Sequence, residues 1–218
     1  MIAEGLAAVK ARIAVACARA GRDPGSVTLV AVSKLKPLAD IEEAIAAGHR
    51  VFGENYAQEL RDKAAALAHV PDVEWHAIGP LQTNKAKYVA KVASAFHALD
   101  RLEVAEALGA RRQQPLDCYL EVNVADEATK IGVPLAEVGR LYEQVRSVAG
   151  IRVVGLMTMP PMIAPEACRP HFRAVREAAH ALGLSGLSMG TTEDFEVAIE
   201  EGATVVRIGR SIFGARVA

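Results

Sequence analysis

A lysine stands at the end of an apolar, β-branched run, where its type and its position could together support covalent chemistry. The segment Leu29–Lys34 reads LVAVSK, a pattern that predicts a strand. Because strand side chains alternate between two faces, Lys34 continues the face of Val30 and Val32. Burial lowers the pKa of a lysine and favours the free amine that attacks an aldehyde. From strand position alone, a lysine that reaches out to solvent is the simpler interpretation.

Two segments near the C-terminus combine glycines, hydroxyl groups and an arginine in a pattern that suits phosphate binding. The runs Gly186–Gly190 and Thr204–Gly209 predict the last two strands. In a barrel of alternating strands and helices, phosphate is usually bound by the loops that follow these strands. The candidate phosphate ligands are Gly190, Thr191, Thr192, Gly209 and Arg210. Ordinary helix capping by either threonine is the alternative.

Arg207 lies inside the last predicted strand, on the same face as Val205 and Gly209. A buried arginine requires an acceptor. If the sheet closes on itself, the last strand neighbours the first, and Arg207 comes close to Lys34. Two adjacent cations need a group between them, and a phosphorylated pyridine ring would serve. Its aldehyde would meet Lys34, its nitrogen would face Arg207, and its phosphate would lie over Thr192 and Gly209.

Other predicted strands contribute further candidates for this site. Asn55 could bind a ligand or cap the following helix, and His76 could bind a ligand or be a hydrogen-bonded core residue. Met157 could pad a flat ring or fill the core. Glu121 and Asn123 need polar partners, so they either line the mouth of a barrel or, as the alternative, form a charge pair inside it.

The segments that must position these residues alternate between strand and helix patterns. Apolar residues at helical spacing predict an N-terminal helix over residues 1–20. Eight strands are predicted, at Leu29–Lys34, Val51–Asn55, Glu74–Gly79, Ala95–Leu99, Leu116–Val124, Val153–Met159, Gly186–Gly190 and Thr204–Gly209. Such alternation implies right-handed βαβ units and a parallel sheet, so the fold class is α/β. Eight units predict a single (β/α)8 TIM-type barrel domain over residues 1–218. An open doubly wound sheet is the alternative, although no GxGxxG turn follows the first strand.

The composition limits the classes of partner. Lysines and arginines number 25 against 26 acidic residues, for a net charge of −1, so neither nucleic acid nor an anionic membrane surface is expected as a partner. The three cysteines are far apart and show no metal-ligand spacing, so no disulfide framework and no metal site are expected. No apolar run approaches the ~20 residues of a membrane span, and the N-terminus lacks the apolar core of a signal peptide. A soluble, cytoplasmic protein is therefore expected.

Together, several motifs resemble the pyridoxal phosphate homeostasis protein family, the single-domain relatives of the alanine racemase barrel. The matching stretches are Val30–Pro37 (VAVSKLKP), Phe52–Tyr56 (FGENY), Trp75–Lys85 (WHAIGPLQTNK), Glu121–Val124 (EVNV), Gly155–Met157 (GLM), Leu187–Gly190 (LSMG) and Val206–Gly214 (VRIGRSIFG). The resemblance implies pyridoxal 5′-phosphate (PLP) bound as a Schiff base to Lys34, with Arg207 at the pyridine nitrogen. It also implies phosphate contacts on the loop after LSMG, and on the backbone of Gly209 and the next residue.

The sequence departs from this family pattern at the implied phosphate site. Thr191 and Thr192 stand where relatives commonly have methionine and serine, and Arg210 stands where many have threonine. Thr192 keeps the hydroxyl group, whereas Arg210 replaces a hydroxyl with a charge. Relatives also have a lysine where Lys130 lies, and a role in cofactor transfer is one hypothesis for it. Lys36, which is assigned to the loop after the first strand, is the other lysine considered for transfer.

Two functions are open at this stage. An arginine at the ring nitrogen disfavours its protonation and makes the ring a weaker electron sink, although racemase relatives share this feature. Racemisation also needs a second acid or base, which in those relatives is a tyrosine from a partner's C-terminal domain. This sequence runs only four residues past Gly214, and no comparable motif surrounds its tyrosines, Tyr56, Tyr88, Tyr119 and Tyr142.

The sequence therefore predicts a PLP-binding protein that holds or delivers the cofactor, with little or no turnover. The resemblance implies a part in vitamin B6 and amino-acid homeostasis, with apo-enzymes that use PLP as possible recipients and a monomer as the expected form. A PLP-dependent amino-acid racemase is the alternative.

Overall fold

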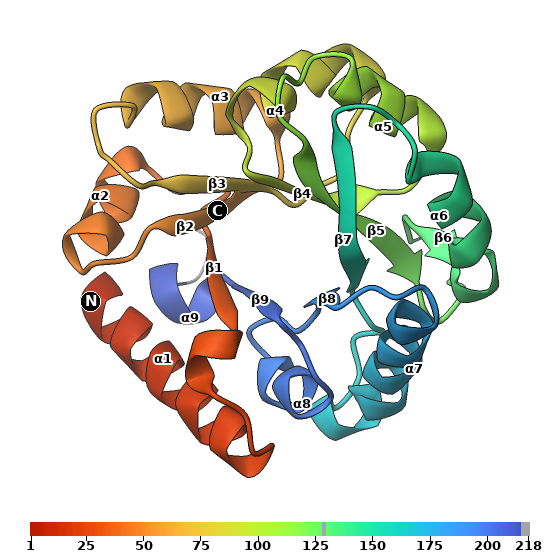
Figure 1. The fold of residues 1–218 in the computed structure, drawn as a ribbon. Coiled ribbons are helices and arrows are strands. Elements are labelled where there is room, and N and C mark those ends of the chain that lie inside the picture. The colour runs from red at the N-terminus through yellow and green to blue at the C-terminus, as the bar shows by residue number, and fades with distance from the viewer. Residues whose placement is uncertain (128–129, 215–218) are drawn as a thin grey trace.

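Parallel strands form a closed ring with helices around it (Figure 1). The structure is a computed structural model and describes residues 1–127 and 130–214. In these residues, the ring consists of β1 (Thr28–Val32), β2 (Val51–Glu54), β3 (Glu74–Ala77), β4 (Ala95–Leu99), β5 (Leu116–Asn123), β7 (Ile151–Thr158), β8 (Gly186–Ser188) and β9 (Val205–Ile208). Each strand pairs in parallel with its neighbours, and β9 pairs with β1. The predicted (β/α)8 barrel is confirmed, and the open-sheet alternative is wrong. A short strand that was not predicted, β6 (Val133–Pro134), pairs with β5.

The first strand ends earlier than predicted. The N–H group of Ser33 still donates to the carbonyl of Gly53 at 3.0 Å, but β1 itself ends at Val32. The chain then turns, and Leu35 adopts a left-handed conformation with φ 60°. Lys34 therefore lies in the turn beyond the strand and is half-buried, whereas the sequence pattern predicted it as the last strand residue.

Helices cover the outside of the ring, mostly between consecutive strands. The α-helices are α1 (Ile2–Arg19), α2 (Leu38–Ala46), α3 (Ala57–Ala66), α4 (Ala86–Val92), α5 (Leu102–Gly109), α6 (Val138–Val145), α7 (Arg169–Ala181), α8 (Phe195–Glu200) and α9 (Arg210–Phe213). The short 3-10 helices are η1 (Pro24–Ser26), η2 (Thr83–Lys85), η3 (Leu135–Glu137) and η4 (Pro165–Cys168). No helix within the described residues is both long enough and apolar enough to cross a membrane.

The N-terminal helix α1 covers the place where the ring closes. It packs against α2, α8 and α9, and it buries the apolar residues whose spacing predicted it, Ile2, Leu6, Val9, Ile13 and Cys17. A Cβ atom on Gly5 would come within 2.7 Å of the carbonyl oxygen of Ser211. Only glycine permits so close an approach, so α1 rests directly on the backbone of α9.

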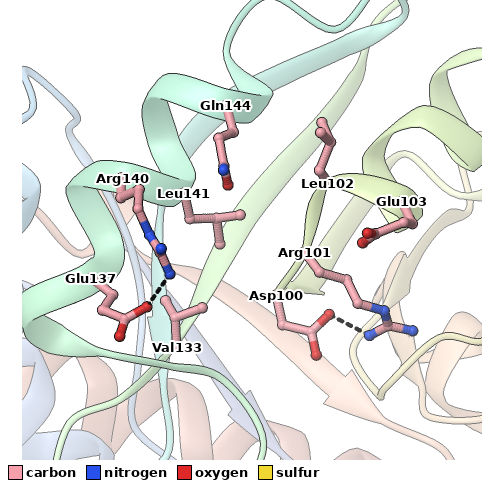
Figure 2. A pocket seen from close by; sticks show the side chains of 9 residues that line it. All are labelled: Asp100, Arg101, Leu102, Glu103, Val133, Glu137, Arg140, Leu141 and Gln144. Atoms are coloured by element: carbon pink, nitrogen blue, oxygen red, sulfur yellow. Dashed lines mark hydrogen bonds and ion pairs between the residues drawn. The ribbon is translucent and has the colours of Figure 1, made fainter.

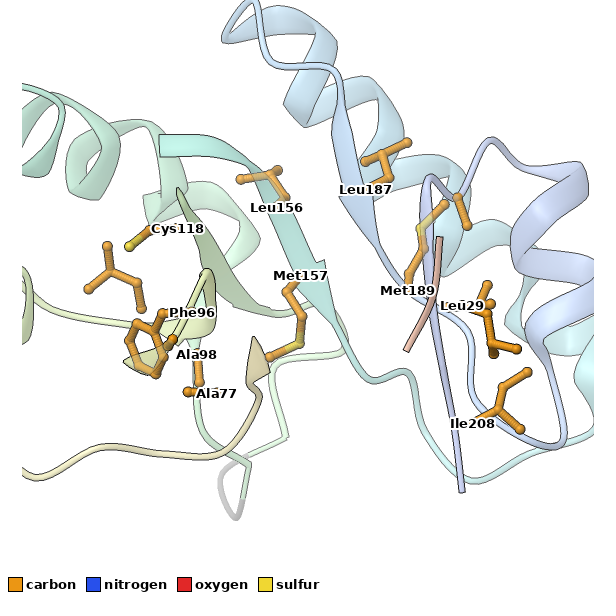
Figure 3. Packing of buried hydrophobic residues seen from close by; sticks show 14 of the residues in the cluster. Leu29, Ala77, Phe96, Ala98, Cys118, Leu156, Met157, Leu187, Met189 and Ile208 are labelled. Atoms are coloured by element: carbon orange, nitrogen blue, oxygen red, sulfur yellow. The ribbon is translucent and has the colours of Figure 1, made fainter. Parts of the chain in front are cut away.

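The main hydrophobic core lies between the ring and the helices. Its largest fully buried side chains are phenylalanines from strands and helices: Phe52, Phe96, Phe172 and Phe195. Figure 3 shows part of this core, where Leu29 of β1 and Ile208 of β9 lie near Met189. All three cysteines are buried and free, as expected of small hydrophobic residues.

The inside of the ring is more polar than this core, and Glu121 is one of its ionisable side chains. Glu121 lies on β5 two residues after Tyr119, whose ring lies 4.5 Å from that of His97. Its Oε2 atom is buried without a hydrogen-bond partner among the described residues. Burial, followed by the nearby charge of Asp100, raises the pKa of Glu121 to about 7, and Arg207 partly opposes this effect.

This raised pKa makes the stability of the fold depend on pH. Between the ordinary glutamate pKa and about 7, the folded state holds a proton that the unfolded chain has released, so stability falls as pH rises through this range. We expect Glu121→Gln to raise the free energy of unfolding at pH 8 by about 2 kcal/mol, and by less at pH 5. Urea unfolding at both pH values measures this difference. The exposed Glu42→Gln on α2 is the matched control, and an equal effect of Glu121→Gln at both pH values would contradict the prediction.

Candidate functional site

The closure of the ring pairs the strand that contains Arg207 with the strand that leads to Lys34. Val30 of β1 lies opposite Arg207 of β9. Beyond them, a Cβ atom on Gly209 would come within 3.0 Å of the carbonyl oxygen of Val32. The start of α9 therefore lies against the end of β1, two residues before Lys34. The pairing of β1 with β9 confirms the prediction that the first and last strands are neighbours.

A buried lysine that the sequence analysis missed supports the residue before Lys34. Lys63 on α3 is only 7% exposed. Its Nζ atom donates to the carbonyl oxygen of Ser33 at 2.7 Å and to Oε1 of Glu54 at 2.8 Å. The hydroxyl group of Ser33 donates to the same Glu54 oxygen at 2.6 Å. Burial raises the pKa of Glu54, and the contacts with Lys63 and Ser33 oppose that shift.

The same lysine also reaches the residue after Lys34. Lys63 donates to Oε1 of Glu59 at 2.6 Å, and this oxygen accepts the N–H group of Leu35 at 2.7 Å. We call Ser33, Glu54, Glu59 and Lys63 the Lys63 network. It holds the backbone on both sides of Lys34 and stabilises the left-handed turn. The i, i+4 spacing of Glu59 and Lys63 was the available signal, but such pairs are usually solvated.

Arg207 is buried and bound to acceptors on two neighbouring strands. Its Nη1 atom donates to the carbonyl oxygen of Ser188 at 2.7 Å and to Ser188 Oγ at 2.6 Å. Its Nη2 atom donates to the carbonyl oxygen of Thr158 at 3.1 Å. Burial lowers the pKa of Arg207 to about 10, while Glu121 and Asp194 oppose the shift, so the guanidinium stays charged at neutral pH. The acceptor that the sequence analysis required is therefore present.

Two histidines extend this hydrogen-bonded group across the inside of the ring. His97 Nδ1 lies 2.7 Å from Ser188 Oγ, and His97 Nε2 lies 3.0 Å from His76 Nδ1. The sequence analysis named His76 as a ligand candidate, with a hydrogen-bonded core residue as the alternative, and this geometry is that of the alternative. His97 and Ser188 were not singled out, because their partners lie on strands far apart in the sequence.

The loop after β8 is ordered by its own aspartate. The N–H and hydroxyl groups of Thr191 both donate to Asp194 Oδ1, at 2.6 and 3.0 Å. This hydroxyl is therefore engaged as a donor in the turn that leads into α8. It does not cap that helix, whose N-cap residue is Asp194, and Thr192 follows half-buried. Gly190 has φ 94°, and a Cβ atom there would come within 2.8 Å of Phe195 Cα. The loop consequently requires glycine at this position.

The loop after β9 lies beside the loop after β8. The N–H group of Arg207 donates to the carbonyl oxygen of Gly190 at 3.0 Å. The helix α9 begins at Arg210, so the first N–H groups of α9 have no carbonyl partner within the helix. The side chain of Arg210 extends to the surface, where it pairs with Glu193 at 3.0 Å. The backbone N–H group of Arg210, rather than its guanidinium, is thus the donor placed for an anion.

Asn55 lines a cavity at the carboxyl ends of β2, β3 and β4. The cavity has a volume of about 490 Å³, and its wall is formed by Asn55, Tyr56, Ala57, Gln58, Pro80, Leu81, Gln82, Lys85, Asp100, Arg101 and Ile131. The residue at the N-cap of α3 is Tyr56, so Asn55 does not cap this helix. Neither Lys34 nor Arg207 belongs to this wall, so the cavity does not enclose these two residues.

A second, smaller cavity of about 280 Å³ lies between α5 and α6 (Figure 2). Asp100 and Arg101 belong to both cavity walls and form an ion pair at 2.6 Å. On the opposite wall, Glu137 pairs with Arg140. Four of the charged side chains that line this cavity are thus paired with one another, and no predicted site residue lies in its wall.

The remaining candidates have structural partners. Met157 is 1% exposed and belongs to the buried hydrophobic cluster, as its core alternative predicted (Figure 3). Asn123 exchanges two hydrogen bonds with the backbone of Glu127 and thereby closes the loop after β5. Lys36 donates to the carbonyl oxygen of Phe213 at 2.7 Å, and Lys130 donates to that of Pro160 at 3.0 Å. Both lysines therefore tie loops together at the carboxyl end of the ring.

Comparisons with known proteins agree with this fold and these motifs. The family described as alanine racemase, N-terminal domain, matches residues 5–217. The pyridoxal phosphate homeostasis protein of Pseudomonas aeruginosa is 47% identical over 221 residues, which cover 99% of this chain and 96% of that protein. The protein of the same name from Escherichia coli is 42% identical over 229 residues, which cover 99% and 97% of the two chains.

A solved structure extends the likeness to three dimensions. The structure of PipY of Synechococcus elongatus PCC7942, with PLP bound, covers 98% of this chain and 100% of its own, with a TM-score of 0.85 and 33% identity. The chain therefore belongs to the family of the alanine racemase N-terminal domain and, within it, to the pyridoxal phosphate homeostasis proteins.

Proposed function

We propose that this protein binds PLP at the carboxyl end of the barrel, and holds or delivers it as part of vitamin B6 and amino-acid homeostasis. The names of the curated relatives and the PLP-bound PipY structure support this function. The observation that carries it is the buried Arg207, whose guanidinium donates to Ser188 and Thr158. Arg207 lies on β9, and β9 pairs with β1, the strand that leads to Lys34.

The residues at the ring closure fit the chemical groups of PLP. When bound, PLP supplies an aldehyde that reacts with primary amines and a pyridine ring that accepts electron density. Lys34 would be the covalent anchor, and Arg207 would face the ring nitrogen. Thr192 and the backbone of Gly209 and Arg210 would hold the phosphate, because the first N–H groups of a helix attract anions. Thr191 would contribute chiefly by keeping Asp194 in place.

The electrostatics favour a holding function over catalysis. Arg207 can only donate hydrogen bonds, so it favours an unprotonated ring nitrogen and a weak electron sink. Tyr119 is buried against His97, and burial raises its pKa to about 12, so it is a poor proton donor at neutral pH. Apo-enzymes that use PLP are the proposed recipients, and a cytoplasmic monomer is the proposed form.

Attachment of PLP to Lys34 can be tested directly. We expect the purified protein, mixed with PLP and reduced with borohydride, to carry one pyridoxyl group on the peptide that contains Lys34. Lys34→Ala should abolish this label, whereas Lys91→Ala, which removes an exposed lysine on α4, should leave it unchanged. Peptide mapping by mass spectrometry provides the measurement. Labelling that persists at full stoichiometry in Lys34→Ala would refute the assignment of the anchor.

The Lys63 network should govern both stability and attachment. Lys63→Met leaves Glu54 and Glu59 without their buried cation, and breaking such a pair costs about 3 kcal/mol of unfolding free energy. Because the backbone beside Lys34 is then released, the absorbance change on mixing with PLP should be slower. Urea unfolding and stopped-flow absorbance measure the two effects. The surface variant Lys87→Met serves as the control, and unchanged values of both quantities in Lys63→Met would oppose the assigned role.

Racemase activity should be absent or very low. In deuterated water, we expect loss of the α-proton of L-alanine at a rate close to that of free PLP, because the described residues offer no tyrosine suited to act as a second acid or base at the site. Proton NMR follows this exchange. Rapid, stereospecific exchange that disappears in Lys34→Ala would show that the racemase alternative is correct.

A further inference from the structure

Four side chains from four strands form a continuous hydrogen-bonded chain inside the ring. They are Arg207 of β9, Ser188 of β8, His97 of β4 and His76 of β3, and all four are buried. The joining distances are 2.6 Å from Arg207 to Ser188, 2.7 Å from Ser188 to His97 and 3.0 Å from His97 to His76. Beyond His76, its Nε2 atom lies 3.9 Å from Oε2 of Glu74, at the amino end of β3.

The direction of every hydrogen bond in this chain follows from its first member. A guanidinium has only donors, so Ser188 Oγ must accept from Arg207. The hydroxyl proton of Ser188 then needs an acceptor, and His97 Nδ1 is placed to accept it. His97 must therefore carry its own proton on Nε2 and donate it to His76 Nδ1. By the same rule, His76 carries its proton on Nε2, which faces Glu74.

The surroundings of His97 favour a single, neutral form. Burial lowers the pKa of His97 well below its ordinary value, and the positive charge of Arg207 adds to this effect. A charged His97 would also have to donate to Ser188 Oγ, which would leave the hydroxyl proton of Ser188 without its acceptor at His97 Nδ1. The ring of Tyr119 lies 4.5 Å from that of His97 at an interplanar angle of 31° and so fixes the plane of the imidazole.

We propose that Ser188 and His97 are positioning residues that orient Arg207 toward the ring nitrogen of the bound cofactor, through a one-way chain of donors that ends at Glu74. Beyond the guanidinium of Arg207, every donor in the chain points away from the cofactor, so the side chains behind Arg207 have no proton to pass to the ring nitrogen unless every hydrogen bond among them reverses. This inference rests on the proposed function, and it adds the residues that keep the ring nitrogen unprotonated.

The first test uses the protein without added PLP. Nitrogen-15 NMR of histidine-labelled protein at pH 7 should show His97 neutral, with its proton on Nε2 and an unprotonated Nδ1. The spectrum of His97→Asn, which lacks this residue's signals, assigns them. A charged His97, or a proton on Nδ1, would overturn the direction of the chain, whether or not the protein binds PLP.

The second test compares variants loaded with PLP that is labelled with nitrogen-15 in its ring. Ser188→Ala and His97→Phe remove the acceptor for Arg207 or for the Ser188 proton. Each should weaken PLP binding about threefold to tenfold, as expected for a lost orienting hydrogen bond, and shift the ring-nitrogen signal toward the protonated form. His97→Asn, whose amide oxygen can replace Nδ1 as the acceptor, should restore the wild-type signal. The exposed His69→Phe is the control.

The outcomes separate this inference from the proposed function. A ring-nitrogen signal in His97→Phe and Ser188→Ala that equals the wild-type signal would overturn the positioning role while leaving PLP binding intact. Failure of the wild-type protein to bind PLP would instead refute the proposed function, and the tautomer of His97 would still decide the direction of the chain. Thermal unfolding of each variant confirms that it is folded before the signals are compared.

Discussion

The pairing of β1 with β9 is the contact on which the candidate site depends. It joins segments that are about 175 residues apart, and each half of the site lies on one side of this seam. Lys34 follows β1, whereas Arg207 and the start of α9 belong to the other side. Gly209 makes the approach close enough for both halves to face one ligand, because a side chain there would collide with Val32.

Buried charge is the main energetic cost of this arrangement, and the structure offsets it by full pairing. Lys63 contacts three oxygen atoms and Arg207 contacts three, so each cation replaces the water it has lost with fixed acceptors. Glu54 and Glu121 differ, because the Oε2 atom of each is buried without a hydrogen-bond partner among the described residues. The buried cations are thus satisfied by fixed acceptors, whereas these carboxylates each keep one unsatisfied oxygen.

The sequence contained enough information to predict the fold and to single out Lys34 and Arg207 as candidate site residues. Strand and helix periods alternate clearly, and Lys34 and Arg207 are conspicuous as cations that interrupt apolar strands. The partners of these residues could not be predicted, because they depend on which side chains meet across the ring. His97 lies in a correctly predicted strand, yet its contact with Ser188 joins β4 to β8, which are not neighbours. Thr191 was assigned from its position after a predicted strand and from its hydroxyl group, and the turn in which this hydroxyl donates to Asp194 was not predicted.

The packing of α1 on α9 determines when the surroundings of Lys34 are completed during synthesis and folding. Residues near the beginning of the sequence, including Gly5, need a backbone that is synthesised some 200 residues later. Contacts of such long sequence separation form late in folding. During synthesis, Lys34 therefore leaves the ribosome early, but the structure around it forms only after α9 has left the exit tunnel. The proposed capture of an aldehyde by Lys34 would therefore belong to the finished protein alone.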